Sequence, residues 1–368
     1  MLTSDYLTQG PITEAFETAI ASYAGSKNAI AVNSATSGLH LALLACGVRD
    51  GDEVWTTPNT FVATANAARM CGATVKFVDI DPQTLNLSPD TLMAALDIAK
   101  KSQRLPRAII FVHFGGNPTG FREVAQIAAS FDIDLIEDAS HALGSKILGQ
   151  PIGNCTYSKA TIFSLHAVKP ITSGEGGVVT TNDLFIADQI RLLRSHGVTR
   201  NPDWFQHSSP KVKQPKWYYE QIALGFNYRM SDIHAALGLS QAQKIDPFAN
   251  HRRELAKAYE ECFRDTGIET QHHNHEVESA RHLFVIKCPS PEIRDQLTQR
   301  FDLVGIGYNF HYIPVYRHPY YSAADLDHRD FKYMEDYYAR GLTLPLHAFL
   351  TKDDVEEIAQ TIRAELVE

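Results

Sequence analysis

The chain has 368 residues, of which 44% are hydrophobic and 21% are charged, and this composition is typical of a folded globular protein rather than a disordered one. Its net charge is −9 and it contains no long basic run, which argues against a surface for nucleic acid or for an anionic membrane. No apolar run approaches the ~18 residues needed to span a bilayer and the N-terminus lacks a signal-peptide core, so small molecules are the expected partners.

Short β-branched segments alternate with longer amphipathic segments between residues 28 and 182, which predicts an α/β layer. The expected strands are Ala29–Asn33, Glu53–Thr56, Thr74–Val78, Ala108–Val112, Asp134–Ile136, Ala160–Ser164 and Gly177–Thr181. The expected helices are Thr36–Ala45, Val62–Met70, Pro89–Ile98 and Glu123–Phe131. The strands are strongly apolar, which indicates burial on both faces, as in a mainly parallel sheet.

The pattern changes near residue 245. A long charged helix is expected over Pro247–Phe263, then a strand at His282–Ile286 and a closing helix after Lys352. Because the chain exceeds the size of one hydrophobic core, we expect a large domain over 1–245 and a smaller α+β domain over 246–368. The segment Thr199–Tyr219 is expected to be a long irregular loop.

Cysteine and histidine spacing gives little support for a metal site. The five cysteines are scattered and form no CxxC pair, so a reduced, cytoplasmic compartment is expected. His272, His273 and His275 have no cysteine close by, which favours a solvated loop over a metal site.

Ligands of such a sheet bind beyond the carboxyl ends of the strands. The turn Asn33–Gly38 is small and polar and opens a helix, so it either binds a phosphate through backbone N–H groups or is an ordinary helix cap. Phe61 also opens a helix, and it either packs in the core or presents its face to a flat ring.

Two acids, Glu137 and Asp138, follow an apolar strand, so at least one is expected to meet a cation or a donor unless it is a surface helix cap. Lys169 follows the Ser164 strand and precedes a glycine-rich turn. A lone lysine is usually solvated, but this arrangement could hold it in a cleft, where a partly desolvated amine has a lowered pKa and attacks an aldehyde. Asp138 would then pair with a pyridinium ring that acts as an electron sink.

The order of these motifs resembles that of the DegT/StrS sugar aminotransferases, which are fold-type I enzymes that use pyridoxal 5′-phosphate (PLP). The resemblance covers essentially the whole chain. The motifs that carry it are Tyr6–Pro11, Asn33–Gly38, Asp138–His141, Ser164–Gly177, Arg194–Gly197 and Gly225–Met230. Relatives usually have a further stretch with a short helix before the Tyr6 motif, so we expect either a trimmed start or a site that lacks this wall.

The resemblance implies three catalytic residues: Lys169 bonds PLP and moves protons, Asp138 pairs with the pyridine nitrogen, and His141 lies near the ring 3-oxygen. Lysine at 169, where dehydrating relatives have histidine, favours transamination. The other implied cofactor contacts are the stacking ring of Phe61 and a phosphate-binding set made of Ala35, Thr36, Ser164 and, from the neighbouring subunit, Asn227. A homodimer with shared active sites follows from that last contact.

Within the family, residues 138–145, 166–172 and 311–316 most resemble the UDP-sugar C4 aminotransferases of pseudaminic acid biosynthesis. The implied reaction converts a UDP-linked 4-keto-6-deoxy-N-acetyl-hexose to its 4-amino sugar, with glutamate as donor. The implied substrate contacts are Tyr6, Glu175, Arg229, His311, Tyr312 and Tyr316. A structural ion pair is an alternative for Arg229. Alternatives for the protein are amination at C3 or of a dTDP-sugar, PLP binding without turnover, and a cysteine desulfurase or lyase.

Overall fold

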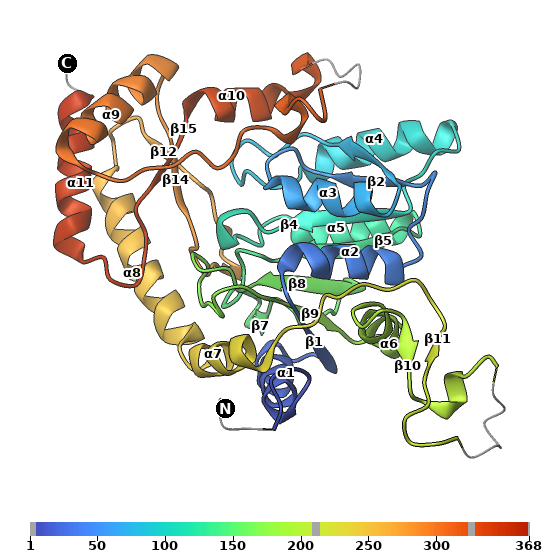
Figure 1. Cartoon of the computed structure of the whole chain (residues 1–368). Helices are drawn as coiled ribbons and strands as arrows, with labels where there is room; N and C mark the ends of the chain where they lie inside the picture. The colour runs from blue at the N-terminus through green and yellow to red at the C-terminus, as the bar shows by residue number, and fades with distance from the viewer. Residues whose placement is uncertain (1–4, 208–213, 323–327, 367–368) are drawn as a thin grey trace.

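The structure is a computed structural model that describes residues 5–207, 214–322 and 328–366. A seven-stranded sheet with the spatial order β1-β9-β8-β5-β4-β2-β3 forms its centre (Figure 1). The strands are β1 (Asn28–Val32), β2 (Glu53–Thr56), β3 (Thr74–Phe77), β4 (Ala108–Val112), β5 (Asp134–Asp138), β8 (Ala160–Ser164) and β9 (Gly177–Thr181). All neighbours pair in parallel except β9, which is antiparallel to β1 and to β8. The predicted α/β fold with a mainly parallel sheet is confirmed.

Helices cover both faces of this sheet, because successive residues of a strand point to opposite faces. Ala29 and Ala31 of β1 belong to a core that includes residues of α1 (Pro11–Ala24), α4 (Pro89–Lys101) and α5 (Phe121–Ser130). Ile30 and Val32 belong to the core on the other face, formed with α2 (Ala35–Ala45), α3 (Val62–Met70) and α6 (Leu184–Leu193). Helix α7 (Asp232–Ala242) packs against α1.

Most predicted boundaries in this region agree with the structure. β2, β4, β8, β9 and α3 begin and end at the predicted residues, whereas β5 continues two residues further than expected, to Asp138. The predicted loop 199–219 begins one residue early, because Thr199 still belongs to β10 (Val198–Thr199), which pairs with β11 (Glu220–Gln221). Its described part includes the 3₁₀ turn η2 (Pro202–Trp204). Residues 208–213 lie outside the described residues.

The C-terminal part has its own antiparallel sheet, ordered β12-β14-β15. Its strands are β12 (Glu269–Thr270), β14 (Phe284–Lys287) and β15 (Gly341–Leu344). Its helices are α8 (Ile245–Cys262), α9 (Pro291–Val304), α10 (Lys332–Arg340) and α11 (Lys352–Glu365), with 3₁₀ turns η3 (Val315–Arg317) and η4 (His328–Phe331). Residues such as Leu255, Phe301 and Ile358 form a separate buried cluster here, and Figure 1 shows this part beside the large sheet.

The division into domains 1–245 and 246–368 stays a prediction. Helix α8 begins at Ile245, close to the expected boundary. However, β13 (Val277–Glu278) pairs with β6 (Lys146–Ile147), which in turn pairs with β7 (Gln150–Pro151), so one C-terminal segment extends a small sheet of the N-terminal part. Within the described ranges, no helix has the length and apolar character needed to cross a membrane.

Candidate active site

Strand pairing brings several polar turns to one edge of the large sheet. Val112 is paired with Asp138 across the parallel strands β4 and β5. Because β9 runs antiparallel to both of its neighbours, its first residue, Gly177, lies opposite the last residues of β8 and β1, Ser164 and Val32. The carboxyl ends of four strands and the start of β9 therefore meet, which is where an α/β sheet binds its ligand.

The turn after β1 opens α2 with small residues. Ser34 is the N-cap, and its hydroxyl oxygen accepts a hydrogen bond from the Ser37 backbone N–H at 3.1 Å. Gly177 passes so close to this turn that an added Cβ atom would lie 2.6 Å from the Ala35 nitrogen and from the Ser34 carbonyl carbon. The first N–H groups of α2 have no partner in their own helix and carry the positive end of the helix dipole, so the turn can hold a phosphate.

Asp138 is buried and held in place at the end of β5. One carboxylate oxygen accepts a hydrogen bond from the Thr64 hydroxyl at 2.7 Å, and the other accepts one from the Ser140 backbone N–H at 3.1 Å. Glu137, which points to the other side of the strand, lies 2.8 Å from His113 Nε2. Both acids therefore have partners, and the lone pairs that remain on Asp138 can accept a ligand N–H.

Lys169 lies in a tight turn after β8. Its backbone N–H donates to the His166 carbonyl at 3.0 Å, and the Thr172 hydroxyl donates to the Leu165 carbonyl at 3.1 Å. From helix α8, Arg252 donates to the Pro170 carbonyl at 3.3 Å. These bonds fix the backbone on both sides of the lysine, so its side chain starts from a defined point at the edge of the pocket.

These elements enclose a pocket of about 320 Å³. The lining residues come from the α2 turn, from the start of α3, from the ends of β5 and β8, and from the C-terminal part. They include Phe61, Asp138, His141, Lys169, His282 and Tyr312. Phe61 is 60% exposed at its rim, so the interpretation of Phe61 as a core residue is wrong.

Burial controls the charges in the pocket. It lowers the pKa of Lys169 to about 8, against a smaller opposing effect of the Asp138 carboxylate. Burial lowers the pKa of His141 and of His282 well below the usual value, and that of His311 to about 4, with the charge of Lys169 adding to each decrease. The pocket therefore combines a lysine that readily loses its proton with neutral histidines.

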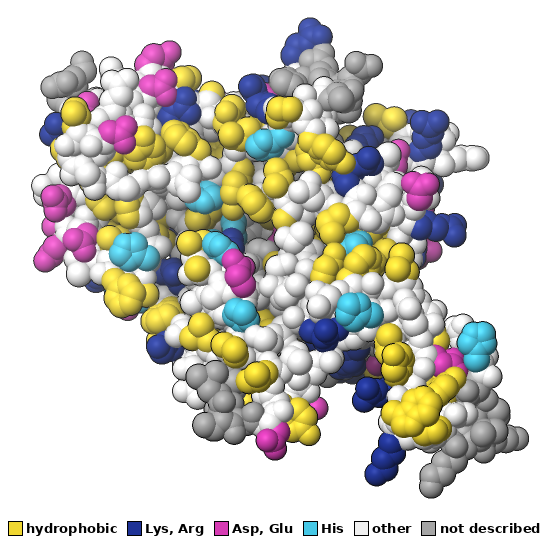
Figure 2. Space-filling view, viewed as in Figure 1, with side chains coloured by type: hydrophobic (Ala, Val, Ile, Leu, Met, Phe, Trp, Pro, Cys, Tyr) yellow, Lys and Arg dark blue, Asp and Glu magenta, His cyan; other side chains and the backbone are white. Residues whose placement is uncertain are grey.

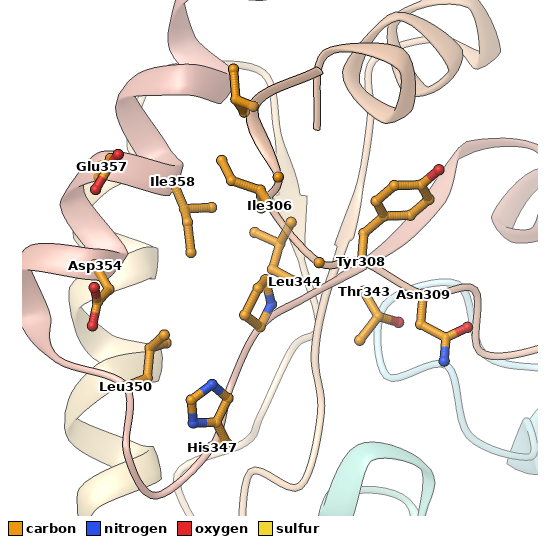
Figure 3. A pocket seen from close by; sticks show the side chains of 14 residues that line it. Ile306, Tyr308, Asn309, Thr343, Leu344, His347, Leu350, Asp354, Glu357 and Ile358 are labelled. Carbon is orange, nitrogen blue, oxygen red and sulfur yellow. The ribbon is translucent and has the colours of Figure 1, made fainter. Parts of the chain in front are cut away.

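A second, larger groove of about 720 Å³ lies on the C-terminal part (Figure 3). Aliphatic side chains such as Ile306, Leu344 and Ile358 form its floor, with Asp354 and Glu357 on helix α11 at its edge. None of the predicted site residues and no lysine is among the residues that line it. The smaller pocket is therefore the candidate active site.

The structure brings most of the predicted residues together. The predicted residues that line the pocket are Ala35, Thr36, Phe61, Asp138, His141, Ser164, Lys169, Glu175, His311 and Tyr312. Three predicted residues do not line the pocket of their own chain: Tyr6, which is 57% exposed, Asn227 and Arg229. Asn227 was expected to act in the neighbouring subunit, and that expectation stays a prediction.

Tyr316 was expected to contact the substrate, but the structure places it in the core. Its side chain is fully buried, its ring stacks on Phe331 with 4.4 Å between the ring centroids, and its hydroxyl donates to Glu335 at 2.7 Å. A tyrosine that follows a proline turn, as Tyr316 does, can be a core residue or a pocket residue, and the sequence alone does not distinguish the two. Its predicted contact with substrate is therefore not supported.

Several pocket residues were not predicted from the sequence. Thr60 lies two residues before α3 and Thr64 lies in its first turn, and their hydroxyl oxygens are 2.7 Å apart. Two threonines four residues apart around Phe61 are a signal that could have found them. His282 reaches the pocket from the segment before β14, and no local pattern indicates this, because the contact depends on how the C-terminal part packs.

The histidine-rich loop is only partly solvated. His272 and His275 are exposed, as expected, but both ring nitrogens of His273 are buried and have no partner among the described residues. Within the described ranges, no group of three or more potential metal ligands occurs.

Comparison with known proteins defines the class. Residues 1–363 match the DegT/DnrJ/EryC1/StrS aminotransferase family, and the chain belongs to this family. The protein is thus a PLP-dependent sugar aminotransferase.

Among curated relatives, the chain is 37% identical to the spore coat polysaccharide biosynthesis protein SpsC of Bacillus subtilis, over 98% of this chain and 91% of that protein. It is also 37% identical to the UDP-4-amino-4,6-dideoxy-N-acetyl-beta-L-altrosamine transaminase of Campylobacter jejuni, with the same coverage. Among solved structures, Helicobacter pylori PseC, an aminotransferase involved in the biosynthesis of pseudoaminic acid, is 32% identical (TM-score 0.85; 100% and 94% of the two chains). Spr1654 of Streptococcus pneumoniae in its PLP form is 27% identical (TM-score 0.87; 100% and 94%).

The residues of the pocket fit PLP. The α2 turn offers N–H groups and hydroxyls for the phosphate, and Gly177 lets β9 pass close to the backbone of this turn, where a Cβ atom would overlap it. Asp138 offers a buried carboxylate for the ring nitrogen, and Lys169 offers an amine for the aldehyde. One pocket thus offers a suitable group for each of three parts of PLP: its phosphate, its ring nitrogen and its aldehyde.

Proposed function

We propose that this enzyme transfers the amino group of glutamate to C4 of a UDP-linked 4-keto-6-deoxy-N-acetyl-hexose. The observation that carries the proposal is the partly buried Lys169 amine, whose pKa is lowered to about 8, in one pocket with Asp138 and the α2 turn. The choice of sugar is supported by the identity with the Campylobacter transaminase and by the similarity to PseC.

PLP bound in this pocket would supply an electron sink that stabilises a carbanion at the carbon from which a proton is removed. The N–H groups of the α2 turn, with Ser164, would hold its phosphate, and Asp138 would accept a hydrogen bond from its protonated ring nitrogen. A carboxylate next to a cationic nitrogen stabilises the charged form of both groups. Phe61, at the rim, would cover one face of the ring.

Lys169 would have two tasks in the proposed reaction. Its neutral amine, which burial favours, would hold the aldehyde of PLP. The free Nζ atom would serve as the base that removes a proton from the donor carbon and as the acid that returns it. The hydrogen bonds of its turn would keep the Lys169 backbone in place during both tasks.

Selectivity for the substrates would come from the open side of the pocket. Glu175 and His311 line the pocket, and the largely exposed Glu175 carboxylate lies 3.7 Å from His166 Nε2. One pocket must accept glutamate and then a nucleotide sugar, and contacts to the distant nucleotide can be used to lower the barrier at the reacting carbon.

We further propose a cytoplasmic homodimer with shared active sites. The supporting observation is a set of large hydrophobic side chains that are exposed in the single chain, which is unfavourable unless a partner covers them. They are Tyr6, Leu7, Trp217, Tyr219, Leu224, Ile233 and Leu237. Figure 2 shows hydrophobic side chains gathered on the β10–β11 arm. A two-fold dimer would let Asn227, Tyr6 and Arg229 reach the partner's pocket.

The proposal is tested by incubating the purified enzyme with PLP, glutamate and the UDP-linked 4-keto sugar, and by measuring 2-oxoglutarate. We expect one 2-oxoglutarate for each amino sugar, and turnover at background for Lys169→Ala. Borohydride reduction and peptide mapping should place the cofactor mass on the Lys169 peptide of the wild type. Cofactor on another lysine, or 2-oxoglutarate formed without any amino sugar, would refute the proposal.

A further inference from the structure

A chain of two hydrogen bonds crosses the wall of the pocket. The Gly115 backbone N–H donates to His141 Nδ1 at 3.3 Å, and His141 Nε2 lies 3.2 Å from the Tyr312 hydroxyl oxygen. Gly115 has φ 66°, a conformation that favours glycine. Its carbonyl accepts the backbone N–H of His282, and the ring of His282 packs 4.5 Å from that of His141. The His141 ring thus accepts a hydrogen bond from the backbone and packs against a second ring that is tilted by 52°.

The backbone bond fixes where His141 carries its proton. A backbone N–H can only donate, so Nδ1 must offer a lone pair. Burial lowers the pKa of His141 well below its usual value, so the ring is neutral at physiological pH. A neutral imidazole carries one hydrogen, which must therefore be on Nε2. His141 is then the donor to the Tyr312 oxygen, and both of its nitrogens are used within the protein.

The Tyr312 hydroxyl hydrogen must consequently point elsewhere. Burial raises the pKa of this phenol, with a further contribution from Asp138, so the hydroxyl keeps its proton. The side chain lines the pocket, and within the described ranges its hydroxyl has no hydrogen-bond partner other than His141. The pocket therefore contains a phenolic donor whose direction is set by Gly115 through His141.

The chemistry of the cofactor identifies the acceptor. In PLP the phosphate arm and the 3-oxygen are on opposite sides of the line that joins the ring nitrogen to the aldehyde carbon. If the phosphate lies at the α2 turn, the nitrogen at Asp138 and the aldehyde at Lys169, the 3-oxygen faces the remaining wall, to which His141, His282 and Tyr312 belong. We propose that Tyr312, positioned by His141, donates its hydrogen bond to this 3-oxygen; the inference rests on the proposed function.

Other ionisable groups also face the pocket and must be considered in any titration. They are Asp138, His166, Lys169, Glu175, His282 and His311. None of them is altered in the variants proposed below, so differences between these variants report on the Tyr312–His141 pair.

The test is a pH titration of the absorption spectrum of the holoenzyme, which follows the proton that the cofactor–lysine adduct shares with the 3-oxygen. A hydrogen bond donated to the 3-oxygen stabilises its anionic form, so loss of this hydrogen bond makes the 3-oxygen more basic. For Tyr312→Phe we expect the midpoint to rise by about one to two pH units, the size of one hydrogen bond to a charged group, and PLP to dissociate roughly tenfold more readily. Tyr321→Phe is the matched control, because that hydroxyl donates to Asn66 outside the pocket, and it should titrate like the wild type.

Two further variants test the positioning role of His141. In His141→Gln the amide oxygen can accept from Gly115 and the amide nitrogen can donate to Tyr312, so the midpoint should stay near that of the wild type. In His141→Met both bonds are lost, and the midpoint should rise towards that of Tyr312→Phe. Equal shifts in these two variants would overturn the role of His141.

Peptide mapping reports which lysine carries the cofactor, and the titration reports the hydrogen bond to the 3-oxygen, so the two experiments test the proposed function and the role of Tyr312 independently. A Tyr312→Phe enzyme that carries PLP on Lys169 and keeps the wild-type midpoint overturns the inference and leaves the proposed function standing. Failure of wild-type Lys169 to carry PLP overturns the proposed function itself.

Discussion

The reactivity of Lys169 towards the cofactor should follow the titration of its amine in the apoenzyme. Burial lowers its pKa from the usual 10.5 to about 8. At pH 7.5 about a quarter of the amines would then be neutral, compared with about one in a thousand for an unperturbed lysine, a gain of roughly 200-fold in the reactive form. The rate of bond formation at saturating PLP should therefore rise with pH and level off above a midpoint of about 8.

Stopped-flow absorbance of apoenzyme mixed with PLP between pH 6 and 10.5 measures this rate. A lysine model amine mixed with PLP in the same buffers is the control for ionisation of PLP itself, and its rate should rise up to a pH of about 10.4. Asp138 raises the pKa of Lys169, so Asp138→Asn should move the enzyme's midpoint below that of the wild type. A wild-type midpoint near 10 would show that burial does not control this amine, and a higher midpoint in Asp138→Asn would show that the Asp138 carboxylate does not raise its pKa.

Three further predictions concern the rest of the site. In Asp138→Asn the ring nitrogen loses its anionic partner, so the half-reaction with glutamate, followed by cofactor absorbance, should slow by about a hundredfold or more; an unchanged rate would remove Asp138 from the mechanism. In Gly177→Ala the new Cβ atom would overlap Ser34 and Ala35, so calorimetry should find PLP bound more weakly and stability reduced by about 1–3 kcal/mol, whereas an unaltered protein would contradict the close approach. Mixed dimers of Lys169→Ala and Asn227→Ala chains should regain activity from one intact site, and heterodimers that stay inactive would argue against shared sites.

The layers of the sheet could be predicted because they depend on local patterns. Strands such as β4 and β8 are short apolar runs between turn residues, and their ends match the predicted ones. The position of Asp138 and Lys169 after such strands was sufficient to predict a site at this edge of the sheet. Their arrangement in one pocket with the α2 turn then follows from strand order, which the structure provides.

Contacts that depend on packing of the C-terminal part could not be predicted in this way. His282 lies just before β14; its backbone N–H donates to the Gly115 carbonyl, and its side chain lines the pocket. Tyr316 belongs to the same sequence motif as Tyr312, yet it is fully buried beside Phe331 whereas Tyr312 lines the pocket. A sequence motif identified both tyrosines as candidates, but only the fold separates the pocket residue from the core residue.

The most direct test of the proposed function is the position of the new amine. Purified enzyme with PLP and glutamate is offered 3-keto and 4-keto sugars linked to UDP or to dTDP, and each product is examined by NMR. We expect efficient amination of the UDP-linked 4-keto-6-deoxy-N-acetyl sugar, with nitrogen at C4. Amination only at C3, or only of dTDP-sugars, would contradict this expectation while leaving the family unchanged.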